Sequence, residues 1–210
     1  MKLQEEYKEL LIDYLSYNEI FYKNFGVFTN EKNSTELAKE IASRFYNNLV
    51  CLGNYLLTKD SLGATLIQRY NHELVIDFYY LLNPGGEKDK VEKFFNYNSK
   101  STSRGWSSVQ KKEKEKFIPP WVADGKGLTA IYRKLCDMAH PNIMSIQLNR
   151  KGPEYEYLMI KDSICFCIFE ICLCFEHAPF KELFPSIDWY SNYDINLNFK
   201  DKAAHLLFLD

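Results

Sequence analysis

The sequence predicts an all-α protein: a single-domain bundle of about six to seven helices with a small β-hairpin inserted near residues 143–160. Seven prolines and nine glycines in 210 residues leave few turns, which favours long helices over a many-stranded sheet. Apolar residues recur at spacings of three and four in the first part of the chain, as on the buried face of a helix. No internal repeat or low-complexity linker divides the chain, so one helical domain is expected over 1–210.

Three helices are expected before residue 83. The first covers residues 3–25, and the second runs from a cap at Ser34 or Thr35 to about Thr58. The third covers Leu62 to Leu82 and is the most apolar of the three. We therefore expect the third helix to lie at the centre of the bundle.

A polar interlude separates these helices from the next apolar segment. The run Asn83-Pro84-Gly85-Gly86 ends the third helix, a shorter helix covers about 88–97, and the interlude spans 98–127. From Gly85 to Lys116, nine Lys or Arg face five Asp or Glu. This basic excess is typical either of a solvated face or of a patch that attracts phosphate.

The last part of the chain combines apolar and irregular patterns. Leu128 to Asn142 reads as an amphipathic helix, and two β-prone runs, Ile143 to Leu148 and Tyr155 to Ile160, predict the hairpin. A final core helix is expected from Asp162 or Ser163 to about His177. The aromatic tail after it is expected to be irregular, with one terminal helical turn.

Composition excludes several classes of protein. The net charge of −2 creates no global field for nucleic acid or acidic lipid. The stretch MKLQEEYKELL is charged and periodic and lacks the apolar core of a signal peptide, and the longest apolar run, Ile164 to Phe175, is interrupted by Glu170 and is too short for a bilayer. We therefore expect a cytoplasmic protein with no membrane partner and with reduced cysteines.

The cysteines do not predict a metal site. The pairs Cys165-x-Cys167 and Cys172-x-Cys174, followed by His177, place each pair about 200° apart around a helix, so neither pair converges on one ion. We expect them to be buried as small apolar residues. No Gly-rich phosphate loop, G-x-S-x-G or H-E-x-x-H motif is present, so no cofactor or metal is expected.

Arg133 and His140 are the candidate catalytic residues. They lie seven residues apart in LTAIYRKLCDMAHPN, so they share one helix face about 10.5 Å apart along the axis. Pro141 places the imidazole at the helix C-terminus, where carbonyl dipoles favour its protonated form. An arginine can bind a scissile phosphate, and a histidine can exchange a proton with a ribose hydroxyl. The alternative is a surface cation and a helix cap.

Arg69, His72 and Glu73 are the candidate supporting residues. They lie in the run QRYNHELVIDFYYLL on the third helix, where Arg69 and Glu73 are four residues apart and can pair along its surface. One interpretation is an ion pair that ties this helix to a neighbour. The other is a polar cluster facing Arg133 and His140.

The run YRKLCDMAHPN resembles the arginine–x(4–6)–histidine motif of the HEPN superfamily. The resemblance implies an α-helical bundle, often dimeric, and in many members a metal-independent ribonuclease of toxin–antitoxin and phage-defence systems. It implies that Arg133 and His140 form the site at a dimer interface. Lys134 after the arginine and Pro141 after the histidine depart from the motif.

A second resemblance covers more of the chain. QRYNHELVIDFYYLL followed by YRKLCDMAHPN is similar to a family of uncharacterised bacterial helical proteins, which implies a shared polar cluster of Arg69, Glu73 and His140 but no reaction.

The sequence therefore supports two hypotheses about function. The first is an HEPN-like defence or toxin-type endoribonuclease, whose partners would be RNA, an antitoxin or other protein, and a second copy of the chain. The alternative is a non-catalytic helical interaction or sensor module in which the Arg-Glu-His cluster is structural.

Overall fold

In the computed structural model, the described residues are 2–23, 29–82, 89–95, 152–176 and 178–208. Within them the chain forms seven helices and no strand, so the predicted all-α class is confirmed for this part of the protein. The helices are α1 (Lys2–Lys23), α2 (Ser34–Thr58), α3 (Ser61–Leu82), α4 (Lys90–Phe95), α10 (Gly152–Phe175), α11 (Ala178–Leu183) and α12 (Trp189–Phe208).

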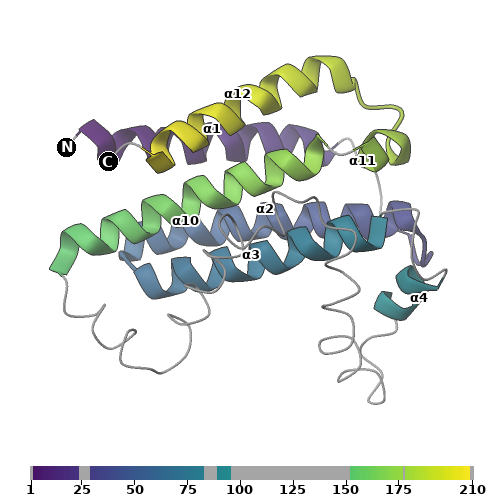
Figure 1. The fold of residues 1–210 in the computed structure, drawn as a ribbon, viewed down its shortest axis with the longest axis horizontal. Helices are drawn as coiled ribbons and strands as arrows, with labels where there is room; N and C mark the ends of the chain where they lie inside the picture. The colour runs from purple at the N-terminus through teal and green to yellow at the C-terminus, as the bar shows by residue number, and fades with distance from the viewer. Residues whose placement is uncertain (1, 24–28, 83–88, 96–151, 177, 209–210) are drawn as a thin grey trace.

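The long helices pack side by side around α10. Figure 1 shows α1 and α12 on one side of α10, and α2 and α3 on the other. Helix α10 contacts each of these four helices, whereas α3 packs mainly on α10 and α2. Among the described helices, α10 therefore takes the central place that was expected of the third helix.

The central position of α10 follows from its sequence. Nearly every residue from Ile160 to Phe175 is buried, because the helix is apolar on all sides and must be covered all round. Even so, none of the described helices is long and apolar enough to cross a membrane.

Helices α2 and α3 form a tight antiparallel pair. Their predicted extents are confirmed, and the connection is short because Lys59 ends α2 in a left-handed conformation with φ of 59°. Asp60 Oδ1 then accepts a hydrogen bond from Gly63 N at 2.8 Å. A Cβ on Gly63 would lie 2.5 Å from Tyr55 Cε1, so only glycine permits this approach of the two helices.

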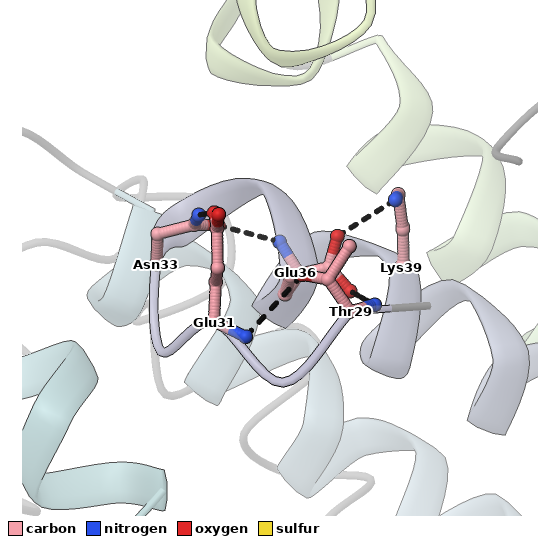
Figure 2. A network of polar contacts seen from close by, with 5 residues as sticks. All are labelled: Thr29, Glu31, Asn33, Glu36 and Lys39. Atoms are coloured by element: carbon pink, nitrogen blue, oxygen red, sulfur yellow. Dashed lines mark hydrogen bonds and ion pairs between the residues drawn. The ribbon is translucent and has the colours of Figure 1, made fainter. Parts of the chain in front are cut away.

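A polar network fixes the start of α2 (Figure 2). The cap is Asn33, in place of the expected Ser34 or Thr35, and its Oδ1 accepts from Glu36 N at 2.9 Å. The buried Glu36 carboxylate accepts from Thr29 N and from Lys39 Nζ, each at 2.7 Å. Its hydrogen bonds with Lys39 and Thr29 hold the pKa of Glu36 below its usual value. The segment before the helix is thereby tied to its first turn.

The predicted hairpin is wrong in its second run. Tyr155 to Ile160 is helical and belongs to α10, which begins at Gly152 instead of at Asp162 or Ser163. Tyr157, Ile160 and Ile164 recur at helical spacing, and packing on that face overrides the β preference of the aromatic residues. The first run, Ile143 to Leu148, lies outside the described residues.

The tail after α10 is also more regular than expected. It forms α11 and the 20-residue helix α12, where a single terminal turn was predicted. The buried face of α12 includes Asn196, whose Nδ2 donates to the Cys172 carbonyl oxygen at 2.7 Å. A buried asparagine interrupts the apolar pattern, which is why periodicity did not reveal this helix. The helix predicted over Leu128 to Asn142 and the interlude 98–127 lie outside the described residues.

Candidate functional site

The structure describes three of the five predicted site residues. Arg133 and His140 lie outside the described part of the chain. Arg69, His72 and Glu73 all lie on α3, and their surroundings decide which of them can meet a ligand.

Arg69 and Glu73 form the predicted pair on the outward side of α3. Arg69 Nε lies 3.4 Å from Glu73 Oε1, and the two side chains are 28% and 43% exposed. Leu66 and Tyr70 are also exposed on this side, and Tyr70 OH accepts a hydrogen bond from the Arg44 guanidinium at 3.0 Å. A guanidinium, a phenol and a carboxylate are therefore accessible together on one surface.

His72 points in a different direction, into the core. It is one residue from Glu73, and one residue is about 100° around a helix. Its Nδ1 contacts Oε1 of Glu170 on α10, and the two side chains are 2% and 0% exposed. The structure thus brings Arg69 and Glu73 together and separates His72 from them.

The contact between His72 and Glu170 belongs to a larger group. Asn71 Nδ2 donates to Glu170 Oε2 at 3.1 Å, and Asn48 Nδ2 on α2 donates to Asn71 Oδ1 at 3.3 Å. All four side chains are buried, and they join α2, α3 and α10. We call Asn48, Asn71, His72 and Glu170 the core polar network.

The core polar network can hold helices together but cannot meet a substrate. Both oxygens of Glu170 have a protein partner, as a buried carboxylate requires. The His72 imidazole is buried against Glu170, so it is not open to a ribose hydroxyl or phosphate in this arrangement. In the folded protein His72 therefore has a structural role.

The cysteines of α10 are core residues, as predicted. All four are buried, and burial raises the pKa of the Cys165 thiol to about 12 and those of the other three well above the ordinary range. Cys172 Sγ lies 3.3 Å from Tyr14 OH on α1. Thiols in this form are poor nucleophiles and poor metal ligands. Among the described residues, no three His, Cys, Asp or Glu side chains are grouped to hold a metal ion.

Sequence reasoning missed the residues that surround His72. Glu170 carried a usable signal, because it is the one charged residue between Ile164 and Phe175, and a lone charge in a buried helix needs a partner. Asn71 and Asn48 carried none, because asparagines at helical positions are ordinary on a surface.

No family model, curated protein or solved structure matches this chain.

Proposed function

We propose that this chain is an HEPN-like protein of bacterial defence or toxin–antitoxin type that cleaves RNA without a metal ion. Arg133 and His140 are its catalytic pair, assigned from their motif in the sequence. The observation that supports the proposal is the Arg69–Glu73 pair, which leaves a guanidinium and a carboxylate accessible on one helix of an all-α bundle.

The proposed reaction is an internal transfer of phosphate. The ribose 2′-oxygen attacks the adjacent phosphorus, and the bond from phosphorus to the 5′-oxygen breaks, leaving a 2′,3′-cyclic phosphate and a 5′-hydroxyl. His140 either removes the proton of the 2′-hydroxyl or gives one to the departing 5′-oxygen. Arg133 binds the phosphate oxygens as a planar donor of hydrogen bonds. One imidazole serves one of these proton transfers, and water or a second copy of the chain serves the other.

Arg69 and Glu73 have supporting roles in this proposal. The Glu73 carboxylate orients the Arg69 guanidinium through their contact at 3.4 Å. The partly exposed Arg69 guanidinium would contact the RNA backbone away from the scissile bond. His72 supports the site only by stabilising α3, through Glu170.

The test is cleavage of a mixed RNA pool in the presence of EDTA. The parent protein should produce fragments with 2′,3′-cyclic phosphate ends, and the His140→Ala and Arg133→Ala variants should leave the RNA intact. The matched control is His205→Ala, because His205 is an exposed histidine in the last turn of α12. Intact RNA at high concentrations of the parent protein would overturn the proposal.

A second candidate function is a non-catalytic interaction or sensor module. The buried contact between His72 and Glu170 favours this alternative. It gives one of the three supporting residues a structural role that needs no catalysis. In that case the parent protein leaves RNA intact, and His140→Ala changes only the stability or the binding of a partner.

The proposed partners and location follow from the ribonuclease hypothesis. A toxin-type protein would act in the cytoplasm and would be held inactive by an antitoxin, and a two-copy site would need a homodimer. Light scattering of the purified chain measures its mass directly, and growth arrest on expression that Arg133→Ala relieves would support toxicity.

A further inference from the structure

The register of the central helix α10 is its axial position against the neighbouring helices. Between Ile160 and Phe175 its side chains are apolar on every side and nearly all buried. Burial of apolar surface is not directional, so by itself it selects the rotation and axial position of α10 less sharply than a buried polar contact with a fixed partner does. Such a contact can select the observed position.

The face of α10 that meets α3 carries a distinctive pattern. Ser163, Cys167, Glu170 and Cys174 are spaced by four, three and four residues, so they form one stripe along the helix. The stripe alternates a polar residue with a small thiol. If α10 slid by four residues, Ser163 would move to the position of Cys167, and Glu170 would move to the position of Cys174.

The polar contacts on this stripe differ in how strongly they depend on register. Ser163 Oγ lies 3.0 Å from Gln68 Oε1 but also 2.9 Å from the Met159 carbonyl oxygen of its own helix, an acceptor that it keeps in any register. Glu170 relies on α3, because its two oxygens are engaged by Asn71 and His72. A slide of four residues, about 6 Å, would remove the carboxylate from both partners and leave it among apolar side chains.

We propose that the core polar network is a register lock, which fixes the axial position of α10 against α3. The apolar core supplies most of the stability of the bundle, and the network selects one arrangement of α10 from several that would bury similar surface. The proposal does not depend on RNA cleavage and would stand if the ribonuclease hypothesis failed.

The test replaces the whole network with apolar side chains of similar shape. The variant carries Asn48→Leu, Asn71→Leu, His72→Leu and Glu170→Met, so the contacts among these four side chains are removed together. Spin-labelled amino acids at Asn47 on α2 and Glu154 on α10, both exposed, report the axial position of α10 by double electron–electron resonance. The label is introduced on the amino acid itself, so the native cysteines are retained.

The parent protein should give one narrow distance distribution. The apolar variant should remain helical by circular dichroism and gain a second population, displaced by up to about 6 Å, or a clearly broadened distribution. Two controls should keep the single distribution: Glu170→Gln, which preserves shape and an acceptor for Asn71, and Glu73→Met, which removes a charge from the outward side of α3.

Two results would overturn the proposal. One is a single unshifted distribution in the apolar variant, which would mean that the shape of the core sets the register. The other is an unfolded apolar variant, because the proposal assigns these four side chains to register and the stability of the bundle to its apolar residues.

Discussion

The two faces of α3 place the neighbouring residues His72 and Glu73 in different environments. Glu73 lies on the outward face, where its pair with Arg69 is partly exposed, and His72 lies on the inward face against Glu170. The outward pair replaces hydrogen bonds to water with a contact between the two side chains, so it stabilises the helix little. The buried pair has no water to replace a lost partner, so its two members depend on each other. Position around the helix decides which contacts are structural and which are accessible.

Removing the buried carboxylate is expected to have the largest effect. Glu170→Ala takes away the acceptor of Asn71 and the partner of His72 and leaves a cavity, so the free energy of unfolding should fall by about 3 kcal/mol or more. Urea unfolding followed by circular dichroism measures it. Glu170→Gln, which preserves the shape, should cost less. If the two variants were equally stable, the contacts of the carboxylate would have no special importance.

Replacing His72 should have the next largest effect. His72→Ala leaves one Glu170 oxygen without its partner in the core and should lower the free energy of unfolding by about 2 kcal/mol. The matched change on the outward face, Glu73→Ala, should lower it by less than about 0.5 kcal/mol. Thermal unfolding of the two variants in one buffer compares them, and a larger loss for Glu73→Ala would reverse the assignment of the two faces.

The Glu36 network should contribute stability that depends on pH. Since the pKa of Glu36 is lowered in the folded protein from an ordinary value of 4.5, its contribution is fully present above that value and is lost as the pH falls through the folded value. The parent protein should therefore exceed Glu36→Gln in stability at pH 7, and the difference should shrink below pH 4.5. A difference that grows on acidification would contradict the sign of this shift.

The smallest expected effect on stability is that of the Arg69–Glu73 pair. Arg69→Ala should change the free energy of unfolding by only a few tenths of a kcal/mol, because the pair is partly exposed and screened by solvent. Under the ribonuclease hypothesis the same variant should bind RNA more weakly, and the loss should be greater at low salt. Fluorescence anisotropy with a labelled RNA measures it. Unchanged RNA binding would remove Arg69 from the site.

The sequence was informative wherever a pattern was local. Periodicity predicted α2 and α3 within one residue or so, and the spacing of Arg69 and Glu73 predicted their pair. Periodicity failed to predict α12, whose buried face includes Asn196. It also failed for the start of α10, where the tyrosines favour a strand. In both helices, tertiary packing overrode the local signal.

The partners of His72 could not be predicted for a different reason. Glu170 lies 98 residues away in the sequence, and nothing in a single sequence aligns two helices at that separation. Arg133 and His140 remain a prediction from their motif, because they lie outside the described residues.

The most direct test of the difference between the two faces of α3 is a pair of double-mutant cycles measured by urea unfolding. One cycle combines His72→Ala with Glu170→Ala, and the other combines Arg69→Ala with Glu73→Ala. We predict a coupling energy of at least about 1.5 kcal/mol for the buried pair and less than about 0.5 kcal/mol for the exposed pair. Equal coupling energies, or a larger value for the exposed pair, would contradict the assignment of a structural inward face and an accessible outward one.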